Sequence, residues 1–147
     1  MDTPRMISTT AAEVGELARK AQTTGDELGL LLHEKSPYES AQSLQREVKS
    51  FADACEVLHS LLNGLMSAKN FLIGPSDEGL YIKIQQAMSE YSTTLDQLCL
   101  SAKKARSSES RFLRPKPKIK EDDLIRARQR IESHLLNTQL MLGVLNL

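Results

Sequence analysis

Aromatic residues are scarce in this sequence. Of its 147 residues, three are tyrosine, three are phenylalanine and none is tryptophan. The core must therefore be built mainly from leucine, alanine, isoleucine, methionine and valine, a mixture that favours helices over sheets. The scarcity also argues against single-stranded nucleic acid as a partner, because proteins that bind it stack the bases on aromatic side chains.

Cysteine and long apolar runs are scarce as well. The two cysteines, Cys55 and Cys99, both fall in apolar stripes of helical spacing. A thiol in such a position behaves as a small apolar group, so we expect both to be buried and reduced. No apolar run approaches the roughly 20 residues that cross a bilayer, and residues 1–10 do not resemble a signal peptide. We therefore expect a cytoplasmic protein, with a membrane-peripheral location as the alternative.

The chain has no net charge, because 19 basic residues balance 19 acidic ones, but the charge is unevenly distributed. Between positions 103 and 120 there are eight basic residues and a single acid, Glu109. The basic residues are Lys103, Lys104, Arg106, Arg111, Arg114, Lys116, Lys118 and Lys120. We favour a solvated linker here. Contact with an anionic membrane, with Phe112 and Leu113 dipping into it, is the second interpretation, and contact with nucleic acid the third.

What the sequence does contain is apolar residues at helical spacing. The clearest stripe consists of Ala41, Leu44, Val48, Phe51, Cys55, Leu58, Leu62 and Leu65. On a helix these residues line one face, which needs a partner surface. Ser36, Pro37 and Glu39 precede the stripe as an N-cap, a first-turn proline and a capping-box glutamate. The spacing passes unbroken through Asn63-Gly64, so we expect the helix to continue there.

Similar stripes predict three further helices. The expected helices cover about residues 10–35, 37–73, 77–106 and 121–146, with a flexible arm at 1–8 and the basic linker at 107–120. Four long helices joined mostly by short connections predict an all-α fold, an antiparallel four-helix bundle. Residues 9–147 would form it as a single domain. The longer third connection would allow the last helix to pack out of simple order.

Candidate catalytic and metal-binding residues do not converge in the sequence. His33, His59 and His134 lie on three different predicted helices, and the chain lacks the paired Glu-x-x-His sequences of a di-iron site. Neither cysteine has the local signature of a nucleophile. We therefore expect the histidines at the surface or its boundary. We also expect no enzyme activity, no metal, no cofactor and no small-molecule substrate.

The C-terminal helix is apolar on more than one face. Its apolar residues are Leu135, Leu136, Leu140, Met141, Leu142, Val144, Leu145 and Leu147. A helix that is apolar nearly all round is either buried or makes a second contact. We give equal weight to two interpretations. One is a central core helix, and the other is a surface for self-association or for another protein, formed by Leu136, Leu140, Met141 and Val144.

The last third of the chain carries a sequence resemblance. Arg111-Phe112-Leu113 is followed by a basic, proline-bearing stretch, a charged helix from Asp122 to Ile131 and a leucine-rich sequence from His134 onward. In this order the chain resembles fungal N-terminal helical domains of the HeLo-like type. The resemblance implies the N-terminal signalling domain of a larger fungal STAND or NLR-like protein, placed ahead of a nucleotide-binding oligomerisation module or ankyrin-type repeats.

Some proteins of that wider group act in programmed cell death by inserting an apolar first helix into a membrane. Here residues 1–17 contain Asp2, Arg5, Glu13 and Glu16 and lack such a run, which argues against pore formation. We therefore predict a non-catalytic protein-interaction and signalling module, with a membrane-associating cell-death effector domain as the alternative.

Overall fold

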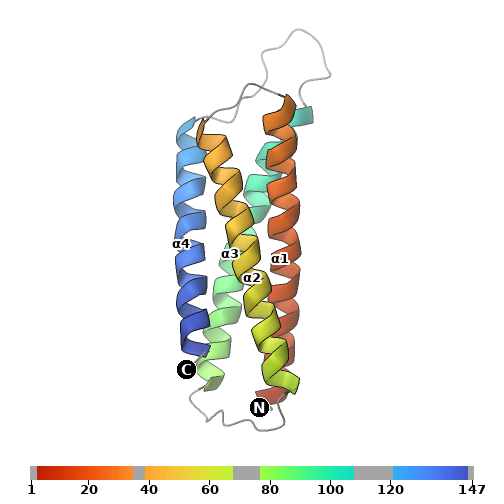
Figure 1. Ribbon diagram of the computed structural model, residues 1–147, viewed down its shortest axis with the longest axis vertical. Coiled ribbons are helices and arrows are strands. Elements are labelled where there is room, and N and C mark those ends of the chain that lie inside the picture. Colours follow the sequence, from red (N-terminus) through yellow and green to blue (C-terminus); the bar gives the residue numbers. More distant parts are fainter. Residues whose placement is uncertain (1–2, 35–38, 68–76, 108–120, 146–147) are drawn as a thin grey trace.

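The computed structural model describes residues 3–34, 39–67, 77–107 and 121–145, and within these ranges the chain is entirely helical. The four helices are α1 (Thr3–Glu34), α2 (Glu39–Ser67), α3 (Asp77–Ser107) and α4 (Glu121–Leu145). They stand side by side as one bundle, and successive helices alternate in direction (Figure 1). The predicted all-α four-helix bundle is thereby confirmed.

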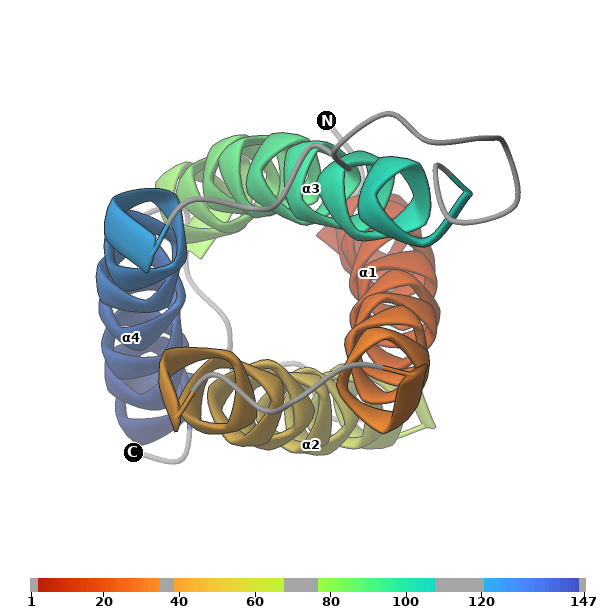
Figure 2. The same cartoon turned by 90° about the horizontal axis from the view of Figure 1, so that it is seen from above.

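The helices occupy the corners of a square, but not in chain order (Figure 2). α1 packs against α2 and α3, and α4 packs against the same two helices from the other side. Within the described ranges, the diagonal pairs α1 with α4 and α2 with α3 share no close backbone contact. Compared with a simple up-and-down ring, α3 and α4 have exchanged places. Consequently α1 has a parallel neighbour in α3, and α2 has one in α4.

The first helix begins earlier than expected. The flexible arm predicted at residues 1–8 is wrong from Thr3 onward, because α1 starts there. Pro4 falls in the first turn, where its missing N–H costs no helical hydrogen bond. Met6 and Ile7 are buried in the core, and Ile7 has no exposed surface. Burial of these two side chains supplies the tertiary packing that extends the helix to Thr3.

The other helices agree with the predicted ranges to within a few residues wherever they are described. α2 continues through Asn63-Gly64 to Ser67, as its unbroken stripe predicts. α3 and α4 begin at the expected positions, Asp77 and Glu121. Ser36 and Pro37 of the capping box, the predicted end of the second helix, and positions 108–120 of the basic linker lie outside the described residues.

The core consists of the predicted stripes. Its largest contributors include Leu28, Leu44, Phe51, Leu58, Leu62, Tyr81, Ile84, Tyr91, Leu95, Leu124 and Ile131. Both cysteines are free. Cys55 is buried as expected, and burial raises the pKa of its thiol to about 12, with a further rise from Glu56. The expectation for Cys99 is wrong, because this side chain is only half-buried. It stands one residue beyond core-facing Leu98, about 100° further around α3.

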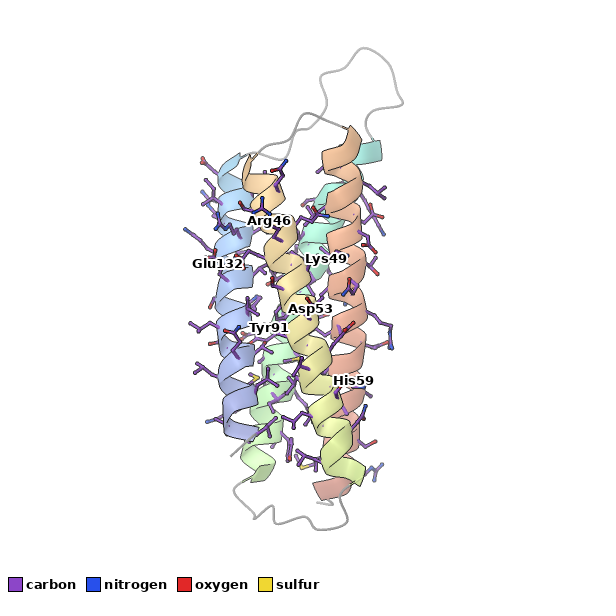
Figure 3. All side chains as sticks on the ribbon, in the orientation of Figure 1. Arg46, Lys49, Asp53, His59, Tyr91 and Glu132 are labelled. Atoms are coloured by element: carbon purple, nitrogen blue, oxygen red, sulfur yellow. The ribbon has the colours of Figure 1, made fainter. Side chains whose placement is uncertain are left out.

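Three glycines of α1 allow side chains of α2 to cross close to its backbone. They are Gly15 under His59, Gly25 under Lys49 and Gly29 under Gln45. A Cβ atom at Gly25 would lie 2.8 Å from Cε of Lys49. The Lys49 ammonium, placed on α2 in Figure 3, donates to Gln22 Oε1 at 3.0 Å and pairs with Asp26 Oδ1 at 2.6 Å. The glycines therefore belong to the α1–α2 interface.

Candidate interaction surface

An apolar strip runs along the outer face of α4 in its C-terminal half. Leu136, Leu140 and Val144 follow one another at four-residue spacing, which stacks them on one side of the helix. Their exposed fractions are 58%, 61% and 51%. Single exposed leucines are ordinary, whereas consecutive ones on one helix face are typical of a contact surface. These three residues are called the α4 strip below.

The other side of the same helical turns packs inward. Leu135, Met141, Leu142 and Leu145 are partly buried against the core. α4 is therefore one of four corner helices, and the interpretation as a central core helix is wrong. The expected association surface also needs a correction at Met141, which packs against the core because it lies about 100° around the helix from Leu140.

Charge divides α4 into two halves. Its N-terminal half contains Glu121, Asp122, Asp123, Arg126, Arg128, Arg130 and Glu132. Some of these side chains pair along the helix, as Arg128 Nε does with Glu132 Oε1 at 3.0 Å. From Ser133 to the last residue, by contrast, His134 is the only ionisable side chain. The α4 strip thus lies wholly in the uncharged half.

A further exposed apolar side chain on α2 lies at the level of the strip. The Phe51 and His134 rings, with centroids 6.2 Å apart, set the register between α2 and α4. Both helices run in the same direction from that contact (Figure 1). Val57 and Leu140 follow Phe51 and His134 by the same number of residues, so they stand at the same height. Val57 is 56% exposed, so an apolar side chain of α2 is also exposed at this height.

The predicted basic residues that belong to α3 lie away from this surface. Lys103 and Lys104 are exposed near the C-terminal end of α3, and Arg106 belongs to its last turn. That end of the bundle lies opposite the end that carries the α4 strip (Figure 1). The other five predicted basic residues, Arg111, Arg114, Lys116, Lys118 and Lys120, lie outside the described residues.

A polar and aromatic cluster at the centre of the bundle was not predicted. The rings of His134 and Tyr91 have centroids 4.2 Å apart, and Phe51 meets Tyr91 edge-on at 5.5 Å. A hydrogen bond of 2.9 Å joins His134 Nε2 to Thr94 Oγ1. The only sequence signal was the position of His134 on the flank of the α4 stripe, four residues before buried Thr138.

Both ionisable groups of this cluster favour their neutral forms. Burial lowers the pKa of His134, Glu90 opposes that change and Arg130 reinforces it. Burial also raises the pKa of Tyr91, although Asn137 and Thr138 lie close enough to oppose the rise. Among the described residues, the buried Tyr91 hydroxyl has no hydrogen-bond partner. This arrangement fits a role in packing α4 against α2 and α3.

A groove of about 650 Å³ separates α1 from α3 on the surface. Leu17 and Met88 are among its lining residues, and Lys20 spans it. The Lys20 ammonium donates to Ser92 Oγ at 2.6 Å and pairs with Asp96 Oδ1 at 3.0 Å. With its ammonium engaged in this way, the groove offers no free cation from Lys20 to an anionic ligand.

The described part of the chain shows no convergence of metal-binding side chains. His59 is half-buried in the α1–α2 groove beside Glu56, and its Nε2 atom lies 3.2 Å from Asn63 Nδ2. His134 is also half-buried, so both agree with the expected boundary position. The side chain of His33 lies outside the described residues. Among the four helices described, none is long and apolar enough to span a membrane.

Comparison with known proteins adds no relative. No protein-family model, no curated protein and no solved structure matches this chain.

Proposed function

We propose that this protein is a non-catalytic interaction module in which a helical bundle presents the α4 strip to a protein partner. The observation that carries the proposal is the exposure of Leu136, Leu140 and Val144 in a charge-free half of α4. Exposed apolar strips on an otherwise polar surface mark contact sites. The inward face of the same helix is fixed by packing on the core, so the strip is held in place before any partner arrives.

The resemblance to HeLo-like domains supports a more specific version of the proposal. A cytoplasmic signalling domain ahead of a nucleotide-binding or repeat region in a fungal STAND or NLR-like protein needs an exposed surface through which to pass a signal or to oligomerise. A bundle that exposes an apolar strip on the outer face of one helix meets that requirement. The full open reading frame tests this version, because it would contain such a region downstream.

Site-specific photocrosslinking tests the interaction surface. A benzophenone side chain placed at Leu140 of the full chain, in the cells that make the protein, should give a discrete crosslinked species on illumination. The matched control is the same side chain at Leu100, which is 54% exposed on α3, away from the strip. Equal adducts from both positions, or none from Leu140, would contradict the proposal.

A second candidate, membrane association by a cell-death effector domain, is favoured by the exposed Lys103 and Lys104 at the start of the basic segment. Each lysine near an anionic lipid surface contributes about 1 kcal/mol. The test is co-sedimentation with vesicles of phosphatidylserine and phosphatidylcholine. Replacing Lys116, Lys118 and Lys120 by Glu should then abolish binding, and unchanged sedimentation would exclude this candidate. The Leu140→Arg variant is the control and should bind as the parent does, because the strip lies at the far end of the bundle.

A further inference from the structure

We infer that the partner of the α4 strip is a second copy of this chain, packed antiparallel with Leu140 at the two-fold axis. This inference rests on the proposed function, because it names the occupant of the same surface. Three observations support it: the spacing of the strip, the distribution of charge along α4, and the level of Val57 on α2.

The spacing makes the strip self-complementary. Leu136 and Val144 each lie four residues from Leu140, one on either side. In a two-fold antiparallel pair, Leu140 meets Leu140, and Leu136 of each copy meets Val144 of the other. Every exposed apolar side chain of the strip then has an apolar partner, as an isologous interface requires. The strip extends about 12 Å along the helix at 1.5 Å per residue.

The charge distribution selects this partner and this direction. The charged residues of α4 all lie between Glu121 and Glu132, before the strip. Antiparallel packing centred on Leu140 leaves both charged halves outside the overlap. Parallel packing would instead align the charged halves and set like charges against each other. A partner with a charged contact face would find no opposite charge on the strip. The strip of a second copy is itself uncharged and needs no opposite charge.

The size of the surface determines how strong the association is. Stable dimers bury about 800 Å² on each partner, and a strip one helix wide and about 12 Å long supplies less than that. Val57, at the height of Leu140, widens the contact onto α2. The result is a weak, reversible dimer. Because the chain has no net charge, the two copies meet without long-range repulsion.

Sedimentation velocity of the purified full chain tests the pairing between about 10 μM and about 1 mM. The sedimentation coefficient should rise with concentration from that of a monomer toward that of a dimer. Leu140→Arg sets two like charges against each other at the axis and should weaken association at least about tenfold. Leu100→Arg, the matched control on α3, should leave association unchanged. Circular dichroism establishes that both variants remain folded, as their exposed positions predict.

Disulfide formation tests the direction of packing independently of any charge effect. In a Cys99→Ala background, buried Cys55 stays protonated and unreactive. Under mild oxidation, a mixture of Leu136→Cys and Val144→Cys chains should form the mixed 136–144 disulfide faster than either chain pairs with itself. Leu140→Cys alone should form a covalent dimer.

The outcomes separate this inference from the proposed function. A chain that stays monomeric up to about 1 mM, a dimer that survives Leu140→Arg, or faster 136–136 than 136–144 crosslinking would each overturn the pairing. If Leu140 crosslinks in cells to a different protein while the purified chain remains monomeric, the interaction module stands and the second copy is excluded. Absence of both crosslink and dimer removes both proposals.

Discussion

At the scale of single residues, the buried threonines of this bundle donate their hydrogen bonds within their own helices. Thr10, Thr24 and Thr138 have no exposed surface. Each hydroxyl donates to the carbonyl four residues earlier in its own helix, at 2.7 to 2.8 Å. This bond satisfies the O–H donor of each hydroxyl within its own helix. Threonine can therefore occupy a core position here.

His134 obtains its hydrogen bond from another helix, because its partner Thr94 lies on α3. Its partly buried ring also packs on Tyr91. The environment disfavours a positive charge, which is why the pKa of His134 lies below the ordinary value of 6.5. Protonation of this ring therefore opposes folding.

We expect the protein to lose stability as the pH falls below about 6.5. The unfolded chain takes up a proton on this imidazole near that pH, whereas the folded chain takes it up only at lower pH. The stability that the neutral His134 ring contributes is thus fully present above the pKa of His134 in the unfolded chain. It is lost as the pH falls toward the lower pKa of His134 in the folded chain. Urea unfolding at pH 7.5 and pH 5.5 measures the difference in free energy of unfolding.

The variant His134→Gln should show a smaller difference between the two pH values. Glutamine has no proton to gain in this range, and its amide can still bond to Thr94. If the pH dependence of the variant equals that of the parent chain, then His134 is not its source.

At the scale of helices, the same residue type serves different purposes along the chain. Gly25 of α1 lies under Lys49, and the α1–α2 interface would have to move to accept a larger residue. Gly64 of α2 is exposed, and apart from the backbone of its own helical turns no atom in the described part of the chain lies within 4 Å of the position that a Cβ would occupy. The first glycine allows a close approach, whereas the second only lowers the helix propensity of α2.

Replacing Gly64 by alanine should therefore stabilise the protein by about 1 kcal/mol. The added methyl meets open space and removes conformational freedom from the unfolded chain. Thermal or urea unfolding measures the gain.

Gly25→Ala is the matched control and should gain less or lose stability. Its methyl would lie 2.8 Å from Lys49 Cε and displace the ammonium from Gln22 and Asp26. An equal gain at both sites would mean that Lys49 yields without cost.

Helix positions and inward faces were predictable from the sequence because periodic spacing reports them directly. The apolar spacing on both sides of Asn63-Gly64 predicted a continuous helix, although this dipeptide is typical of turns. α2 is continuous there. Thr3 to Ser8 were missed because Met6 and Ile7 are too few to show a period alone. The outward strip of α4 was one of two open interpretations, since a sequence records how apolar a helix is but not which faces a neighbour covers. The cluster around His134 needs three helices to meet, which local spacing does not encode.

At the scale of the whole molecule, the order of helices around the bundle is the least predictable feature. Each helix packs an apolar face on the core, and the spacing that predicts this face does not say which helices stand beside it. Polar contacts between α1 and α3 are among those that distinguish the orders. Lys20 of α1 reaches Ser92 and Asp96 of α3, and Gln85 donates to Thr10 at 2.9 Å. Such cross-helix contacts hold α1 and α3 as parallel neighbours.

A double-mutant cycle tests this order in solution. Lys20→Ala and Asp96→Ala should show a coupling energy of about 0.2–1 kcal/mol in urea unfolding, the usual range for exposed ion pairs. Lys20→Ala with Asp123→Ala is the control pair. Asp123 lies on α4, diagonally opposite α1, so these two substitutions should be additive. Equal coupling in both pairs would contradict the observed order.

The unequal interfaces of the square have a consequence for its motion. α3 and α4 share the sparsest of the four contacts, so α4 is held chiefly along α2. Thermal opening of the bundle should therefore begin at the α3–α4 seam, while the α1–α2 pair stays closed. The helix that displays the strip is then also the one that the rest of the fold can most readily release.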